Sequence, residues 1–202
     1  MTDTPHDDLY TGRKDKRVVD YLLKRRSCKL ALMGGEAPSP NDIRTILTAA
    51  ARVPDHGKLA PWRFVVFTGD ARRAFGDSVL RPAYRKAEPD AAPAKLDLEA
   101  ERLMRAPCVI AVISTPKESR HPHWEQQLSA GAAAYNLCLA ANALGYGTNW
   151  LSEWFSFNSD VAAALGLGQH DQIAGFIYIG APCEKGEERP RPELDEITTY
   201  WR

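Results

Sequence analysis

The chain has 202 residues, of which 44% are hydrophobic and 26% charged, a composition typical of a folded globular protein rather than a disordered chain. Its 26 basic and 26 acidic residues cancel to a formal net charge of zero, so it lacks the overall positive charge of most nucleic-acid-binding proteins. No apolar run approaches the roughly 20 residues of a membrane-spanning helix, and the polar start lacks a secretory pattern, so we expect a cytoplasmic protein. The length is that of a single domain.

The first third of the chain contains two predicted helices and one predicted strand. Residues 1–14 are polar, and we expect this segment to be mobile. Across residues 15–26, apolar side chains recur at helical spacing, which predicts a helix that ends in a basic run. Ser39 is a suitable N-cap for a second helix, with a proline at the first position and Asp42 as capping-box partner. Residues 62–68 are β-branched and aromatic, which predicts a strand.

The middle of the chain is interrupted by prolines and then becomes strongly apolar. We predict a helix near 70–80, an irregular stretch, and another helix near 94–105. The most continuous apolar run, residues 107–115, predicts a central strand buried on both faces. A long helix is predicted at 124–144, and its segment 129–134 has so little side-chain bulk that another helix could pack closely against it.

The last third adds two predicted strands, at 146–151 and 173–179, and a brief helix that begins at Ser159. The tail, residues 181–202, is rich in charge and proline, and we expect it to form an arm. The order of elements predicts a single domain over residues 15–180 of the α+β class, with helices packed on one sheet. No G-x-G-x-x-G follows a strand, which argues against a Rossmann dinucleotide site.

The four cysteines do not suggest a disulfide framework or a metal site. Cys28, Cys108, Cys138 and Cys183 lie far apart and include no C-x-x-C pair. We therefore expect four reduced thiols.

Three segments could bind a ligand. The first is Arg25-Arg26-Ser27 at the end of a helix, where two forked guanidinium groups and a hydroxyl suit a phosphate, although cations also favour this position with no ligand present. The second is the irregular loop at residues 52–62, R-V-P-D-H-G-K-L-A-P-W, directly before a strand. The third is the segment 145–153, where glycines would let the backbone approach a flat ligand.

In their order and spacing, these segments resemble the FMN-dependent nitroreductase family, above all its short members, which share R-R-S and R-x-P-D-H. The resemblance covers residues 22–180 and includes the small-residue helix that ends in L-G-Y-G-T-N-W. It implies a nitroreductase-like α+β fold with a central mixed sheet flanked by helices. It also implies a homodimer, with the long small-residue helix and two FMN molecules at the subunit interface.

The resemblance further implies an oxidoreductase. Such an enzyme uses NADH or NADPH to reduce nitroaromatic, quinone or related electrophilic acceptors by ping-pong hydride transfer. The alternative is an FMN-binding protein of the same fold without significant turnover, because one scaffold can host several functions.

The residues expected to bind FMN follow from the resemblance by position. The phosphate and ribityl chain are assigned to Arg25, Arg26 and Ser27, and the N1–C2 edge to Lys29, where a cation would stabilise the reduced flavin. No catalytic residue is assigned, since hydride transfer depends chiefly on apposition and orientation. Family members also place a basic residue near the C-terminus on the phosphate, and the candidates here are Arg189, Arg191 and Arg202.

The other two segments are expected to reach the flavin ring system. By position, Arg52 and His56 contact the flavin bound by the partner chain, and Trp150, Leu151 and Ser152 line the ring. The chain departs from the family pattern at two places. Lys58-Leu59-Ala60 stands where many members have Asn-x-Gln, and Leu151 stands where the short members have Arg. Leu151 can therefore contribute only backbone groups.

Two other sites were considered. A metal site could be proposed from His121-x-His123-x-Glu125, but histidines two positions apart lie on different sides of a helix. A nucleophilic pair could be proposed from Ser27 and His56, but no nucleophile elbow is present. We therefore expect neither.

Overall fold

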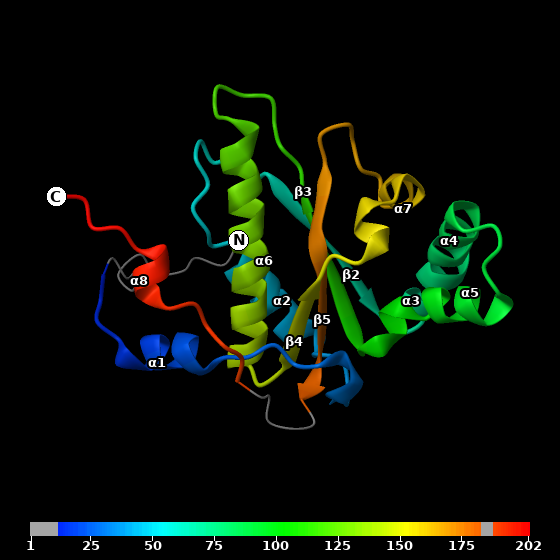
Figure 1. Ribbon diagram of the computed structural model, residues 1–202, viewed down its shortest axis with the longest axis horizontal. Coiled ribbons are helices and arrows are strands. Elements are labelled where there is room, and N and C mark those ends of the chain that lie inside the picture. Colours follow the sequence, from blue (N-terminus) through cyan, green and yellow to red (C-terminus); the bar gives the residue numbers. More distant parts are fainter. Residues whose placement is uncertain (1–11, 183–187) are drawn as a thin grey trace.

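The protein is described by a computed structural model over residues 12–182 and 188–202, and its centre is a five-stranded sheet with helices on both faces (Figure 1). The strands are β1 (Met33–Gly34), β2 (Trp62–Thr68), β3 (Cys108–Ser114), β4 (Gly147–Leu151) and β5 (Gln172–Pro182). The α-helices are α1 (Lys16–Lys24), α2 (Pro40–Ala50), α3 (Ala71–Phe75), α4 (Arg81–Ala87), α5 (Pro93–Ala100), α6 (His123–Ala143), α7 (Ser159–Ala164) and α8 (Leu194–Ile197).

The long strand β5 organises the sheet. It pairs with β3 along one edge and with β4 and β1 along the other, and β2 pairs with β3. Every pairing among the described residues is antiparallel. The α+β nitroreductase-like arrangement is as expected, but within one chain the sheet is antiparallel rather than mixed, because β5 runs opposite to β1, β3 and β4, and β2 runs opposite to β3.

The strand β3 is buried on both faces, as the sequence predicted. Alternate side chains, including Val109 and Ile113, join one apolar core with residues of the π-helical turn Gly76–Leu80, α4 and α7. The others, including Ile110, join a second core with α2 and α6. The sheet therefore separates two hydrophobic layers, and in Figure 1 α6 and the shorter helices α3, α4 and α5 lie on opposite sides of it.

The predicted start of α2 is confirmed. The Ser39 side chain accepts a hydrogen bond from the backbone N–H of Asp42 at 3.1 Å, and Pro40 begins the helix. The Asp42 carboxylate in turn accepts from the Tyr146 hydroxyl at 2.7 Å, which lowers the pKa of Asp42. This bond connects the beginning of α2 to the segment that leads into β4.

The stretch between residues 80 and 93 is more regular than the sequence predicted. We expected an irregular stretch there, but α4 occupies Arg81–Ala87. Pro82 does not end the helical run: α3, the π-helical turn Gly76–Leu80 and α4 follow one another without a break, and the wider π turn directly precedes this proline, which has no N–H to donate. The helix predicted near 94–105 ends at Ala100 and continues as the 3₁₀ turn Arg102–Arg105.

Two peripheral helices leave apolar side chains in solvent. Among its nine residues α1 buries none, and Val18, Val19 and Leu23 are each more than half exposed. In α8, Leu194 and Ile197 are similarly exposed. Within the described parts of the chain, no helix has both the length and the apolar character needed to cross a bilayer.

Candidate functional site

A cavity of about 530 Å³ opens between the end of α1, the middle of α6 and the end of β4. It brings together two of the three sequence segments expected to bind a ligand. Its lining residues are Arg25, Ser27, Tyr135, Cys138, Trp150, Ser152 and Ala174.

The Arg25–Ser27 segment is fixed by backbone hydrogen bonds at both ends. The N–H of Arg25 donates to the carbonyl of Tyr21 at 2.9 Å and closes α1. Directly after Ser27 the chain is bound to β4, since the N–H of Cys28 donates to the Thr148 carbonyl at 2.8 Å. The backbone that carries the Arg25 and Arg26 side chains is therefore held against the sheet by a hydrogen bond to β4.

The guanidinium group of Arg25 has a hydrogen-bond donor for which the described residues supply no acceptor. Its guanidinium lies over the ring of Tyr135, 5.9 Å from the centroid, and its Nη2 is 3.5 Å from the Ser27 hydroxyl. Its Nε is buried and has no partner among the described residues. A buried donor on a cation costs free energy when it is unsatisfied, so this atom favours an acceptor in the cavity.

The end of β4 presents alternate side chains to opposite faces. Trp150 and Ser152 line the cavity, whereas Leu151 packs against the apolar core on the other face. The predicted restriction of Leu151 to backbone contacts agrees with this orientation. The Trp150 indole N–H donates to the carbonyl of Ala174 at 3.0 Å.

Trp150 can occupy this place only because Gly175 has no side chain. An added Cβ on Gly175 would lie 2.1 Å from the indole Nε1, and its backbone has φ +155°. The sheet register between β3 and β5 also shifts at Val112 and Ile113, opposite this glycine. The irregularity in β5 therefore shapes one wall of the cavity.

A second, adjoining cavity of about 290 Å³ lies beside Arg26. Arg26 and Cys28 line it together with Gly145 and Gly147, and it shares Arg25 and Ser27 with the first cavity. The Nε of Arg26 lies 3.8 Å from a Glu188 carboxylate oxygen. Lys29 is exposed at the start of the 3₁₀ turn Leu30–Leu32 and lines neither cavity.

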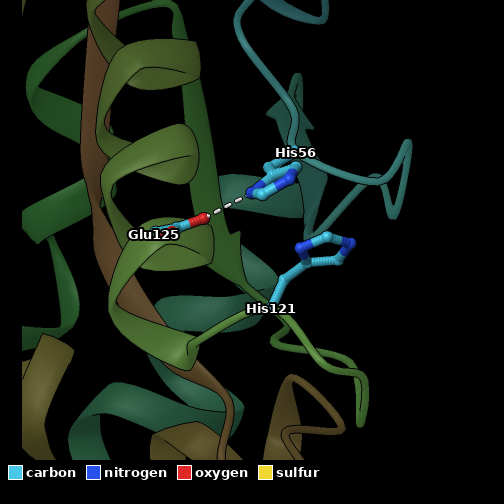
Figure 2. Close-up of side chains that lie close together, drawn as sticks. All are labelled: His56, His121 and Glu125. Carbon is cyan, nitrogen blue, oxygen red and sulfur yellow. Dashed lines mark hydrogen bonds and ion pairs between the residues drawn. The ribbon is translucent and has the colours of Figure 1, made fainter.

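Arg52 and His56 do not join this cavity within one chain. The His56 Nδ1 lies 2.8 Å from a carboxylate oxygen of Glu125 (Figure 2). Glu125 and Tyr135 are ten residues apart on α6, which corresponds to about 15 Å along the helix. Arg52 is exposed, and its carbonyl accepts from the Asn136 amide at 3.0 Å.

The loop that carries His56 has an unusual backbone. Lys58 and Ala60 have positive φ angles of 56° and 45°. The Asp55 carboxylate holds this shape, since it accepts hydrogen bonds from the N–H groups of Leu59 at 3.0 Å and Ala60 at 2.8 Å. The loop is therefore a defined structure that presents His56 and Lys58 to solvent.

The sequence analysis missed three residues that line the cavity. Tyr135 and Cys138 lie one turn apart on α6, and Ala174 precedes Gly175. The i, i+3 spacing within the small-residue helix was the available signal for the first two. Burial raises the pKa of the Cys138 thiol to about 11, so it is neutral at physiological pH and unsuited to act as a nucleophile. Cys28, Cys108 and Cys138 form no disulfide, and Cys183 lies outside the described residues.

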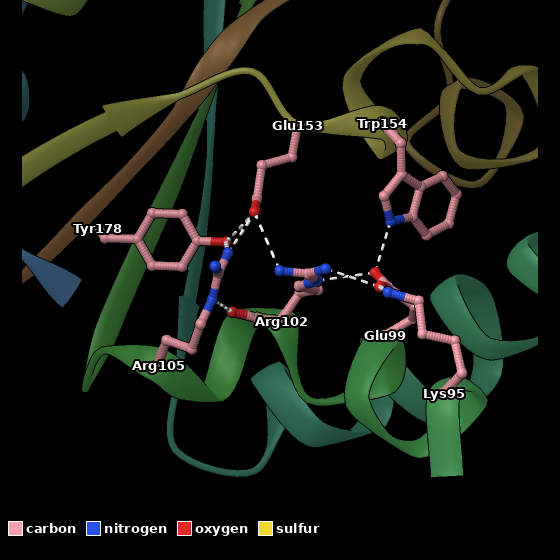
Figure 3. Close-up of polar contacts among 7 residues, drawn as sticks. All are labelled: Lys95, Glu99, Arg102, Arg105, Glu153, Trp154 and Tyr178. Carbon is pink, nitrogen blue, oxygen red and sulfur yellow. Dashed lines mark hydrogen bonds and ion pairs between the residues drawn. The ribbon is translucent and has the colours of Figure 1, made fainter. Parts of the chain in front are cut away.

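A polar network holds the residue that follows Ser152. Glu153 contacts Arg102 at 3.3 Å, and it also pairs with Arg105 and the hydroxyl of Tyr178 (Figure 3). On the far side of Arg102 lies Glu99, whose side chain is 1% exposed. These contacts fix the end of β4 to the segment around α5, and no sequence motif indicated them.

Comparison with known proteins identifies the family. The profile described as "Nitroreductase family" matches residues 22–181. The chain belongs to the nitroreductase family. It is 33% identical over 186 residues to "Putative NAD(P)H nitroreductase YdjA" of Escherichia coli K12, covering 91% of this chain and 99% of the relative. It is 38% identical over 187 residues to "Putative NAD(P)H nitroreductase" of Haemophilus influenzae, covering 91% and 98%.

Solved structures support the same fold for this nitroreductase family member. A nitroreductase-like family protein from Bacillus cereus matches with a TM-score of 0.79 and 21% identity, covering 96% of this chain and 99% of that chain. A "putative nitroreductase in complex with FMN" from Desulfovibrio desulfuricans matches with a TM-score of 0.70 and 25% identity, covering 94% of this chain and 99% of that chain.

Proposed function

We propose that this protein is an FMN-dependent oxidoreductase whose flavin binds in the cavity between α1, α6 and β4. The observation that carries the proposal is the buried Nε of Arg25, a cationic donor that lacks a partner among the described residues and borders the cavity. A phosphate oxygen is the acceptor that a guanidinium fits best.

The residues present fit the whole cofactor as well as its phosphate. Arg25 and Ser27 supply a cation and a hydroxyl, and Trp150 supplies an aromatic wall. The volume of about 530 Å³ lies in the range of sites for small molecules. The Desulfovibrio desulfuricans protein of the same fold was solved in complex with FMN.

FMN, when bound, would supply hydride-transfer chemistry for a ping-pong reaction between NADH or NADPH and a nitroaromatic, quinone or related electrophilic acceptor. The chain's own residues bind and orient it. Arg25, Arg26 and Ser27 would hold the phosphate and ribityl chain, and Lys29 would supply a cation for the pyrimidine edge. Trp150, Ser152 and the backbone of Leu151 line the ring.

We further propose that each complete site uses two copies of the chain. His56 lies about 15 Å along α6 from the cavity of its own chain, and Arg52, which lies beside Asn136, does not line that cavity either. This supports a role for both residues at the flavin of a partner. A groove of about 730 Å³ between α1, α2 and α6, lined by Val18, Leu22 and other residues, offers an apolar surface for that partner. Within the small-residue segment of α6, Ser129, Ala130, Ala133 and Ala134 are buried inside the chain, so only the partly exposed Gly131 and Ala132 would let a second copy approach the helix closely.

The test is the visible spectrum of the freshly purified protein, with the released cofactor identified by mass. We expect a yellow protein that releases FMN and oxidises NADH or NADPH in the presence of a quinone or nitroaromatic acceptor. A yellow protein without turnover would favour the alternative, an FMN-binding protein. A colourless protein that does not take up added FMN would refute both.

The variant Arg25→Ala tests the placement of the cofactor. Loss of a hydrogen bond to a charged group costs about 1.5–3 kcal/mol, so the dissociation constant for FMN should rise about 10- to 150-fold. Arg85→Ala is the matched control, because Arg85 is exposed on α4, on the opposite side of the sheet (Figure 1). Equal FMN affinity of Arg25→Ala and the parent protein, measured by flavin fluorescence, would remove Arg25 from the site.

A further inference from the structure

Four of the five histidines of the chain lie near the first turn of α6, in two ring pairs. His56 and His121 form one pair, with ring centroids 3.8 Å apart. His123 and His170 form the other, with centroids 5.3 Å apart. Glu125 lies beside the first pair, on α6.

We propose that His56, His121 and Glu125 form a binding site for a divalent cation of the zinc class. Each of the three offers a ligand atom, and these atoms all lie within 4.8 Å of one another. Figure 2 shows the three side chains converging from the loop before β2, the segment before α6 and α6 itself. Imidazole nitrogen and carboxylate oxygen are ligands that zinc prefers, and three protein ligands leave one position for water.

The distances need only a small adjustment to hold a cation. With metal–ligand bonds of about 2.0–2.1 Å in a tetrahedron, neighbouring ligand atoms are about 3.3 Å apart. The side chains of His56 and Glu125 are 64% and 45% exposed, so small rotations can close the gap without repacking a core. The hydrogen bond between His56 and Glu125 is then replaced by two bonds to the cation.

The backbone holds the three ligands near one another before any cation binds. Asp55 fixes the loop after His56 through two N–H groups, and Glu125 belongs to the first turn of α6. Gly57, with φ +83°, admits the second imidazole, because an added Cβ would lie 2.6 Å from the ring of His121. Binding of a cation would therefore cost little backbone conformational entropy, because the backbone around the three ligands is already ordered.

The structure changes the set of ligands that the sequence pattern suggested. In His121-x-His123-x-Glu125, the middle residue turns away, toward His170 and toward a carboxylate oxygen of Glu118 at 3.6 Å. His56, which is far away in the sequence, takes its place. This explains why the linear pattern alone argued against a metal site.

The test is calorimetric titration of zinc chloride into the untagged, full-length protein after chelator treatment, a measurement that needs no flavin and no turnover. We expect one high-affinity zinc per chain. His121→Ala and Glu125→Gln should each weaken it by about tenfold or more, since even outer-sphere changes cost 10- to 100-fold. His123→Ala is the matched control and should leave the affinity within about twofold.

Circular dichroism and thermal unfolding of each variant establish that it is folded. Two independent ligand variants are included so that a folding defect in one still leaves the other informative. Absence of zinc binding, or a loss in His123→Ala that equals or exceeds the loss in His121→Ala, would overturn the proposal.

Discussion

The buried carboxylate of Glu99 is the clearest electrostatic contribution to stability in this structure. Its oxygens accept hydrogen bonds from Arg102 at 2.6 and 2.7 Å and from the Trp154 indole at 2.7 Å, and Lys95 lies 2.7 Å away. Burial alone would raise the pKa of Glu99, but these donors outweigh it and lower the pKa from 4.5 to about 2.

This shift makes the stability of the fold depend on pH in a defined direction. The pKa is lower in the folded than in the unfolded chain, so the contribution is complete above about pH 5 and is lost as the pH falls toward 2. A shift of this size corresponds to roughly 3 kcal/mol. At pH 3 the carboxylate is largely protonated in the unfolded chain but still mostly charged in the folded chain, so roughly 1 kcal/mol of this contribution to the free energy of unfolding remains.

The variant Glu99→Gln tests this reasoning. We expect the free energy of unfolding, from urea denaturation, to fall by about 3 kcal/mol at pH 7 and by only about 1 kcal/mol at pH 3. Glu101→Gln is the control: its side chain is 59% exposed, and its loss should cost less than about 0.5 kcal/mol at either pH. An equal loss at both pH values for Glu99→Gln would refute the argument, because the charge would then not be the source of stability.

Two further predictions concern the cavity and its assembly. Gly175→Ala should displace the Trp150 indole and lower the free energy of unfolding by about 1–3 kcal/mol in urea denaturation, whereas Gly168→Ala, whose added Cβ meets only Asp171 at 3.6 Å, should change it far less. Similar losses for the two glycines would contradict the tight contact with the indole. Mixing Arg25→Ala with His56→Ala protein should restore FMN binding or turnover in mixed dimers, since one of the two sites then regains both residues. No recovery after subunit exchange would mean that each site is built from a single chain.

Most local elements follow from short-range patterns in the sequence. The Ser39 cap, the buried strand β3 and the long helix α6 each depend on neighbouring residues that alternate or recur at a fixed spacing. The same logic erred at Pro82, because a proline usually disrupts a helix interior but here follows the π-helical turn Gly76–Leu80 within an unbroken helical run. The local widening of the helix, which no residue pattern indicated, decided the outcome.

The candidate site was only partly visible in the sequence. Arg25, Ser27, Trp150 and Ser152 stood out through motifs, and the fold brings these four to one cavity. No motif indicated that Tyr135, Cys138 and Ala174 line the cavity. Their neighbours in the sequence do not show which strand end lies opposite α6.

The sequence by itself predicted most of the helices and strands, though not α4, α8 or the short strand β1, and it showed which segments carry basic or aromatic side chains. These properties depend mainly on interactions within a few residues. Only the tertiary structure decided that Gly175 makes room for an indole and that Glu99 is surrounded by donors. The same holds for His56, which meets Glu125 across 69 positions of the chain. Contacts between distant segments depend on how the two apolar layers pack on the sheet, and that packing is a property of the whole chain.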